Sequence, residues 1–479
     1  MAPSMASPTT LSSKKTVTTV FAVGLMLFSM FFGAGNLIFP PMLGIESGDR
    51  FAPAITGFLV AGVVLPVITI IAVAVSGSGV RDMASRAGVI FGVIFSVVVY
   101  LSIGSFYAMP RVAAIGYELG IESTFGLSGT GWRVFFTGLF FAVAFVIVLF
   151  PGKVADSLGK VLTPALLILL TVMTIAVIAS MNNPPVAPTE EYASSPLIAG
   201  ILQGYFTMDS IAALAFAIVV VSSFGAAGIT NHKRVVKLSA ISACIAGFFL
   251  MLVYLGLGFM GTRMPNKESY SDGAEILSSA SKLTLGLTGD IIFSAVVLLA
   301  CLTTAVGLIA ASASFFEELL PQLSYRSWAM IFTVIAFTLA NLGLERILTF
   351  STPIIGLIYP PAIALIVTSL VHLLVPRRQL PLTYRTGVYV ALIFSALDLI
   401  VSNNLFGAEV LAEPLAIIPL FSAGLGWMVP TVVAATIAFI FDMQRGLTRD
   451  DDLVSGEIRD PLQRDETPSS DTSQALNRS

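Results

Sequence analysis

The chain carries little charge for its length and almost no histidine or cysteine. Of its 479 residues, 11% are charged and 56% are apolar, and the mean hydropathy is +0.92. Soluble proteins carry roughly 25% charged residues, so this composition excludes an ordinary soluble domain and indicates a polytopic membrane protein. The apolar runs are about 20 residues long, as a membrane-spanning helix requires. Strands of a membrane barrel would alternate over about ten residues instead.

The scarcity of histidine and cysteine excludes several kinds of chemistry. Cys244 and Cys301 lie inside apolar runs, so neither a disulfide framework nor a thiolate metal site is predicted. His232 and His372 lie near expected cytoplasmic edges, so a histidine-based catalytic or metal cluster lacks its members. No Gly-Lys-Ser/Thr loop supports ATP drive. We therefore expect no enzyme activity, no cofactor and no nucleic-acid partner.

Twelve apolar runs predict an all-α membrane protein with twelve transmembrane helices, whose even number puts both termini on one side. Lysine and arginine favour the loops on that side, for example Lys14, Lys15, Arg377 and Arg378. This bias predicts that both termini are cytoplasmic. The predicted spans cover residues 17–43, 51–75, 89–119, 132–150, 158–181, 197–224, 238–260, 291–320, 328–342, 347–374, 384–401 and 415–441.

The polar ends of the chain are expected to lie outside the twelve-helix domain at 17–441. Residues 1–16 and 442–479 are too polar to bury a core, so we expect two disordered cytoplasmic ends. The outside segment 261–289 is long for a connection, and its middle predicts a short helix.

The first span is interrupted where a plain membrane helix would continue. Two glycines and an asparagine are followed by Pro40 and Pro41. Lipid cannot satisfy the backbone groups that such a break frees, so the break must face protein, water or a ligand. Close helix packing at the glycines is the alternative. The residues predicted to line a ligand site are Gly33, Ala34, Gly35 and Asn36.

The sixth span contains a second interruption, with an acidic residue inside an apolar run. Two broken helices at spans one and six predict a 5+5 inverted repeat, with units at about 17–181 and 197–374 and two extra helices at about 384–441. The carboxylate of Asp209 could contact a substrate ammonium, support a cation or cap the second half-helix. The predicted site residues here are Phe206, Thr207, Met208 and Asp209.

The two breaks together suit a zwitterion and a small cation. Half-helix amino termini near Gly35 and Asn36 would attract a carboxylate, because free N–H groups and the helix dipole are positive there. Free carbonyls at the other ends would bind an ammonium group or a cation. Tyr100 and Leu308, with Phe206 and Met208, are candidates for an apolar side-chain pocket, although plain packing explains each of them as well.

Three motifs carry a resemblance to a known family. The run SMFFGAGNLIFPP at 29–41 resembles the signature of bacterial branched-chain amino acid:cation symporters. The run GYFTMDSIAAL at 204–214 resembles their sixth span, and Met109-Pro110-Arg111 resembles part of their third. The resemblance covers the twelve-span body. It implies the fold of the sodium-coupled leucine transporter, and import of leucine, isoleucine and valine with Na⁺ across the bacterial inner membrane.

The resemblance also implies a Na⁺ site between the first break and the eighth span. The run Ala300-Cys301-Leu302-Thr303-Thr304 is similar to the superfamily's ion-binding pattern, although threonines in membrane helices often bond back to their own helix. Carbonyl and hydroxyl oxygens are suitable ligands for a hard cation. The implied ligands are Ser29, Phe32, Ala300, Thr303 and Thr304.

Two further hypotheses concern gating and coupling. Arg111 and Glu118 predict an outer-gate ion pair, and an arginine reaching to interfacial water is the alternative. An alternating-access symporter is the leading function. A proton-coupled or exchange-type transporter, with Asp209 as the titrating group, is the alternative within the class. A membrane-embedded enzyme is disfavoured because the residues for it are missing.

Overall fold

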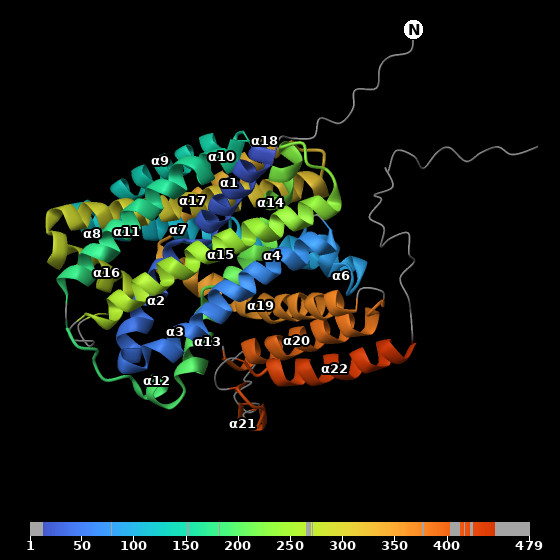
Figure 1. Ribbon diagram of the computed structural model, residues 1–479. Coiled ribbons are helices and arrows are strands. Elements are labelled where there is room, and N and C mark those ends of the chain that lie inside the picture. Colours follow the sequence, from blue (N-terminus) through green and yellow to red (C-terminus); the bar gives the residue numbers. More distant parts are fainter. Residues whose placement is uncertain are drawn as a thin grey trace, which may run out of the picture.

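The computed structural model describes residues 13–445 apart from 78, 151–152, 182, 265–269, 271, 376–377, 403–411, 416 and 422–424. Within these residues the chain consists of helices and their connections and contains no strand (Figure 1). The predicted tail at 442–479 begins in the last turn of the final helix, and residues 446–479 lie outside the described part. The predicted end at 1–16 overlaps the first helix, which begins at Ser13.

The first part of the chain forms helices that are joined in several places by π-helical turns at Val60–Val64, Glu118–Glu122 and Leu158–Leu162. These helices are α1 (Ser13–Phe31), α2 (Ala34–Ser47), α3 (Phe51–Leu59), α4 (Leu65–Ser76), α5 (Val80–Ala84), α6 (Val89–Ile103), α7 (Ala108–Tyr117), α8 (Ser123–Phe125), α9 (Thr130–Val148), α10 (Val154–Ser157) and α11 (Thr163–Ser180).

The second part contains the longest helices of the described chain. They are α12 (Glu190–Ser194), α13 (Pro196–Phe206), α14 (Asp209–Ala226), α15 (His232–Thr262), α16 (Gly273–Leu285), α17 (Leu287–Leu319), α18 (Tyr325–Ala340), α19 (Leu344–Leu374), α20 (Pro381–Ser402), α21 (Ala412–Leu415) and α22 (Met428–Arg445). The helix α16 confirms the short helix predicted within 261–289, and Asp272 caps it by accepting the N–H of Glu275.

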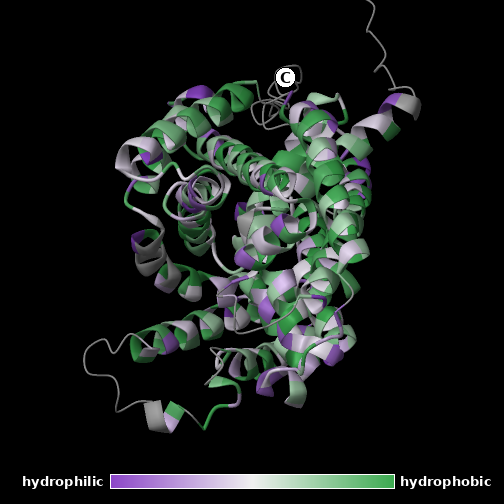
Figure 2. Ribbon diagram, turned by 90° about the vertical axis from the view of Figure 1, so that its left-hand side faces the viewer, coloured by the Kyte–Doolittle hydropathy of each residue, from purple (hydrophilic) through white to green (hydrophobic). Residues whose placement is uncertain are grey.

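The described chain is a multi-pass membrane protein. It contains ten helical runs long and apolar enough to cross a bilayer, and three shorter apolar helices at Lys15–Phe31, Pro196–Phe206 and Tyr325–Ala340. Hydrophobic residues lie on helices all around the bundle (Figure 2). In the most apolar stretches of α14 and α17, 67% of the residues are buried, against 17% in that of α22. The helices α14 and α17 therefore form the centre of the bundle.

The structure confirms both predicted helix breaks. In the first, α1 ends at Phe31 and α2 begins at Ala34, and Asn36 accepts the N–H of Gly33 at 3.3 Å. In the second, α13 ends at Phe206 and α14 begins at Asp209. Met208 between them has a φ of 62°, a left-handed conformation that is strained for a residue with a side chain.

A third break was not predicted, because the span at 89–119 was taken as continuous. The helix α6 ends at Ile103, and α7 begins only at Ala108. A Cβ at Gly104 would lie 2.3 Å from the carbonyl oxygen of Tyr100, so only glycine fits this turn. Pro110 follows in the first turn of α7, where its missing N–H is tolerated. Gly104 and Pro110 together were the available sequence signal.

Glycines bring the helices around the breaks into backbone contact. A Cβ at Gly200 of α13 would lie 1.9 Å from the carbonyl oxygen of Ala54 in α3. A Cβ at Gly44 of α2 would lie 2.0 Å from the carbonyl oxygen of Gly258 in α15. Small residues allow such close approach between membrane helices. Both half-helices α2 and α13 are therefore held directly against their neighbours.

We expect Gly200→Ala to destabilise the protein, because the added methyl group meets backbone that cannot move aside. Overpacking of this kind lowers the free energy of unfolding by about 1–3 kcal/mol. Thermal unfolding in detergent measures the effect. The matched control is Gly356→Ala in α19, where nothing lies within 4 Å of the added Cβ. Equal melting temperatures for the two variants would contradict the close packing of α3 and α13.

Candidate functional site

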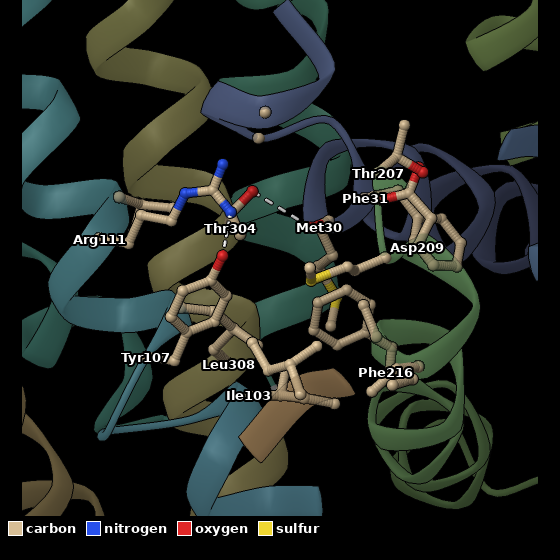
Figure 3. A pocket seen from close by; sticks show the side chains of 18 of the residues that line it. Met30, Phe31, Ile103, Tyr107, Arg111, Thr207, Asp209, Phe216, Thr304 and Leu308 are labelled. Carbon is tan, nitrogen blue, oxygen red and sulfur yellow. Dashed lines mark hydrogen bonds between the residues drawn. The ribbon is translucent and has the colours of Figure 1, made fainter. Parts of the chain in front are cut away.

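The three helix breaks meet at one cavity in the middle of the bundle. Its lining comes from the α1–α2, α6–α7 and α13–α14 breaks, with further residues from α17 and α19. The volume of the cavity is about 90 Å³, and the wider empty space of about 770 Å³ includes open solvent. Figure 3 shows the side chains that project into it.

One wall of the cavity is apolar. Ile103, Phe216 and Leu308 lie on the lower side of the view in Figure 3, and Met30 lies near its middle. The ring of Phe216 also contacts that of Phe31 edge to face, with centroids 5.6 Å apart. Burying a hydrocarbon side chain against this wall would be favourable by about 25 cal/mol per Å². The wall therefore suits a branched apolar group.

Most of the predicted substrate residues lie at this cavity. Gly35 has room around it, since the nearest atoms to an added Cβ are 3.8 Å away, whereas a Cβ at Gly33 would lie 2.9 Å from the Thr304 hydroxyl. Both glycines line the cavity, and Gly33 also allows close packing. The side chain of Ala34 lies outside the described residues. The predicted residues that line the cavity are Gly33, Gly35, Asn36, Thr207, Met208, Asp209 and Leu308.

The structure places two predicted pocket residues away from the cavity lining. Phe206 is 46% exposed and packs on Tyr205, with ring centroids 5.6 Å apart. Tyr100 is buried, donates to the carbonyl of Ala215 and stacks on Phe315 at 4.1 Å. Each residue is on an expected helix but on another face of it. Successive helical residues are 100° apart, so neighbours in sequence face different surroundings.

A buried hydrogen-bonded triad joins the first and second breaks. The Asn36 Nδ2 group donates to Asp209 Oδ2 at 2.7 Å and also to the Tyr254 hydroxyl. The Tyr254 hydroxyl donates to the same Asp209 oxygen at 3.1 Å. Tyr254 comes from α15 and was not predicted. Nothing in the sequence distinguishes it from other aromatic residues in apolar runs, so only the tertiary structure could reveal it.

The triad gives Asp209 a structural role that was not among those predicted. The N-cap position of α14 is Met208, and Asp209 lies in the first turn, so the predicted capping role is not the one observed. Asp209 is 3% exposed, and its carboxylate accepts hydrogen bonds from an amide and a phenol. The positive end of the α14 dipole further stabilises a carboxylate in this position. Asp209 therefore links the two breaks.

Oxygen atoms gather at the predicted cation site between α1 and α17. The Thr303 hydroxyl donates to the Ser29 carbonyl at 2.9 Å and to the Ala300 carbonyl at 3.1 Å. The Thr304 hydroxyl lies 3.2 Å from the Met30 carbonyl and 3.5 Å from that of Ser29. The Met30 carbonyl was not among the predicted ligands of the cation.

Phe32, also predicted at the cation site, lies in the break itself. Its N–H donates to the Phe28 carbonyl, and its ring stacks on that of Phe28 at 5.5 Å. Its ring also lies 6.3 Å from that of Tyr254. These contacts anchor the end of α1. A role of the Phe32 carbonyl in binding a cation stays a prediction.

The predicted outer-gate ion pair does not form. In the described part of the chain, the ion pairs are Arg50 with Asp49 and Lys160 with Asp156. Arg111 turns into the cavity instead, where it donates to the Tyr107 hydroxyl and lies 5.3 Å from the centre of that ring. Arg111 and Glu118 are about two helical turns apart, and Glu118 lies in the π-helical turn after α7.

Comparison with known proteins gives relatives over nearly the whole chain. Residues 16–445 match the family described as branched-chain amino acid transport protein. The branched-chain amino acid permease BrnQ of Corynebacterium glutamicum is 45% identical over 89% of this chain and 96% of its own. BraB of Bacillus subtilis is 36% identical over 88% and 95%, and BrnQ of Escherichia coli K12 is 34% identical over 89% and 96%.

Solved structures share the fold at low sequence identity. Mhp1, a nucleobase-cation-symport-1 family transporter, aligns with a TM-score of 0.53 at 15% identity, over 89% of this chain and 92% of its own. A manganese transporter from Eremococcus coleocola aligns with a TM-score of 0.54 at 13% identity, over 90% and 97%.

The chain is a multi-pass membrane protein with broken helices around a central cavity, and it shares its fold with these solved structures. Its family match and its relatives over nearly the whole chain make it a transport protein. The chain belongs to the branched-chain amino acid transport protein family, whose members among the relatives are permeases and carriers rather than enzymes.

Proposed function

We propose that the protein imports leucine, isoleucine and valine by symport with Na⁺, through alternating access to the cavity at the three breaks. One observation carries the proposal: the cavity combines a helix amino terminus, an apolar wall and an adjacent cluster of carbonyl and hydroxyl oxygens. These are the three recognition elements that a branched zwitterion and a hard cation need. The names of the permease relatives support the substrate class.

The oxygens near Thr303 could bind Na⁺ with little rearrangement. Each threonine hydroxyl now points its hydrogen at a carbonyl of α1, and a hydroxyl rotates freely to present a lone pair instead. Na⁺ between Ser29, Ala300 and the hydroxyls would then hold the end of α1 against α17. Because α1 leads directly into the cavity, Na⁺ would raise substrate affinity, and substrate would raise Na⁺ affinity equally.

The proposed topology has twelve spans in two inverted five-helix units plus two helices, with both termini cytoplasmic in a bacterial inner membrane. Breaks in the first and sixth spans support the repeat. Arg234 donates to Thr16 at 3.3 Å, so the start of α15 lies beside the start of α1. Asp442 near the end of α22 accepts the N–H of Thr383 at the start of α20. Basic residues at these ends support a cytoplasmic location.

We expect isoleucine uptake into proteoliposomes to require an inward Na⁺ gradient. A tenfold gradient of one coupled Na⁺ supplies about 1.4 kcal/mol and concentrates isoleucine at most about tenfold. Radiolabelled isoleucine with Na⁺ or choline outside measures the effect. Equal uptake in both media rules out Na⁺ coupling, and absence of uptake for all three branched amino acids rules out the proposed substrates.

Proton coupling is the second candidate, and the buried Asp209–Tyr254 hydrogen bond favours it. A carboxylate that is 3% exposed in the cavity lining could take up a proton during each transport cycle. Uptake driven by a pH gradient in the absence of Na⁺ would select this mechanism over Na⁺ symport.

A further inference from the structure

We propose that Arg111 binds the carboxylate of the transported amino acid, together with the amino terminus of α2. This inference rests on the proposed function, and it assigns to Arg111 a role in substrate recognition instead of outer gating. It also states which part of the substrate is required: ligands must carry a free carboxylate beside the branched side chain.

The break between α6 and α7 directs Arg111 toward the break between α1 and α2. Arg111 lies in the opening turn of α7, and Tyr107 just before that helix holds the guanidinium by a hydrogen bond and a ring contact. A Cβ at Gly35 would lie 3.8 Å from Arg111 Nη2. Gly35 is in the first turn of α2, so the guanidinium lies beside the helix end whose first N–H groups have no partner within that helix.

The charges at the cavity leave Arg111 without a carboxylate. Among the described lining residues, Arg111 is the only basic residue and Asp209 the only acidic one. Asp209 is engaged by Asn36 and Tyr254, and it lies on the opposite side of the view from Arg111 in Figure 3. A partly buried cation attracts an anion strongly because solvent screens it less. The substrate carboxylate is an anion that the proposed function brings to this place.

The geometry gives the bound amino acid a defined orientation. A guanidinium binds a carboxylate through two parallel hydrogen bonds, and the helix amino terminus adds further donors. With the carboxylate between Arg111 and Gly35, the side chain reaches the apolar wall of Ile103 and Leu308 (Figure 3). The ammonium group would then lie toward the α13–α14 break, which also lines the cavity.

The test is a cycle that removes the charge from the protein, the ligand or both. Dissociation constants for leucine and leucinamide are measured by calorimetry on nanodisc-embedded protein at saturating Na⁺. Arg111→Gln is expected to weaken leucine binding about 10- to 100-fold, as loss of a charge-assisted hydrogen bond does. The same substitution is expected to change leucinamide binding less than about threefold, because coupling is confined to groups in contact. Equal losses for both ligands overturn the inference.

A second variant tests the space between Gly35 and Arg111 without the use of leucinamide. Gly35→Ala puts a methyl group between α2 and Arg111 at ordinary contact distance, so the fold tolerates it. It is expected to weaken leucine binding about tenfold or more by excluding the carboxylate. Unchanged leucine affinity overturns the inference even where leucinamide binds too weakly to measure.

A matched arginine controls for loss of charge and ring contact. Arg133 lies 5.6 Å from the centre of the Tyr117 ring, close to the 5.3 Å between Arg111 and the Tyr107 ring, but it is not in the cavity lining. Arg133→Gln is expected to leave leucine affinity unchanged, and a loss equal to that of Arg111→Gln overturns the inference. If the unaltered protein binds and transports no branched amino acid, the proposed function fails. If it does both and only the cycle fails, Arg111 alone is misassigned.

Discussion

Replacing Asp209 with alanine is expected to abolish isoleucine uptake and to lower stability. The change leaves the Asn36 amide and the Tyr254 hydroxyl buried without their shared acceptor. Each unsatisfied buried donor destabilises by about 1–3 kcal/mol. It also removes the hydrogen bonds that join the α1–α2 and α13–α14 breaks, so the two half-helices would no longer keep one geometry around the substrate.

Uptake into proteoliposomes and thermal unfolding of the purified variant measure these two effects. Tyr254→Phe removes the hydroxyl that donates to Asp209 and accepts from Asn36, but it keeps the hydrogen bond between Asn36 and Asp209. A smaller loss of about 1 kcal/mol is therefore expected. Tyr389→Phe serves as the control, because Tyr389 is 41% exposed and distant from the triad in sequence. An Asp209→Ala variant with normal uptake and melting temperature would show that the triad does not support the site.

Replacing Thr303 and Thr304 together with alanine is expected to raise the Na⁺ concentration for half-maximal uptake about tenfold or more. Both hydroxyls lie within hydrogen-bond distance of α1 carbonyls, where the proposed cation would bind. Loss of even an outer partner of a metal ligand commonly weakens binding 10- to 100-fold, roughly, and direct ligands matter more. The preference among leucine, isoleucine and valine is expected to stay the same, because the apolar wall is intact.

Uptake measured over a range of Na⁺ concentrations provides the test. Thr333→Ala in α18 is the matched control: this buried hydroxyl donates to the Ala329 carbonyl of its own helix at 2.7 Å. Its loss removes the same atoms without touching α1. Unchanged Na⁺ dependence in the double variant would reject the cation site, whereas a loss of uptake at every Na⁺ concentration would leave only a structural role for the two threonines.

The breaks in the first and sixth spans could be predicted because they violate a strong local rule. Paired glycines, or a polar residue such as asparagine or aspartate, indicate an interruption of the helix inside a span. Such an interruption leaves backbone groups without partners, and lipid cannot satisfy them. The third break was missed because Gly104 and Pro110 are each common in membrane helices and lie six residues apart. The close approach of Gly104 to the preceding turn makes this glycine necessary, and that approach is visible only in the folded chain.

The direction of each side chain was harder to predict than its helix. Tyr100 and Phe206 were expected to face the ligand, but their neighbours Val99, Ile103 and Thr207 do so instead. Helical faces are recognised from a contrast between apolar and polar residues. Spans that face lipid on one side and a protein core on the other are apolar all round, so that contrast is missing.

The sequence by itself determined that this is a polytopic membrane protein, that its first and sixth spans are broken, and that its motifs resemble those of branched-chain amino acid symporters. The first two conclusions follow from composition and from local backbone chemistry, and the third is a resemblance carried by the motifs. The tertiary structure alone decided that Tyr254 joins Asn36 and Asp209, and that Arg111 turns toward Gly35 and away from Glu118. Such pairings depend on how distant helices pack, which no short stretch of sequence encodes.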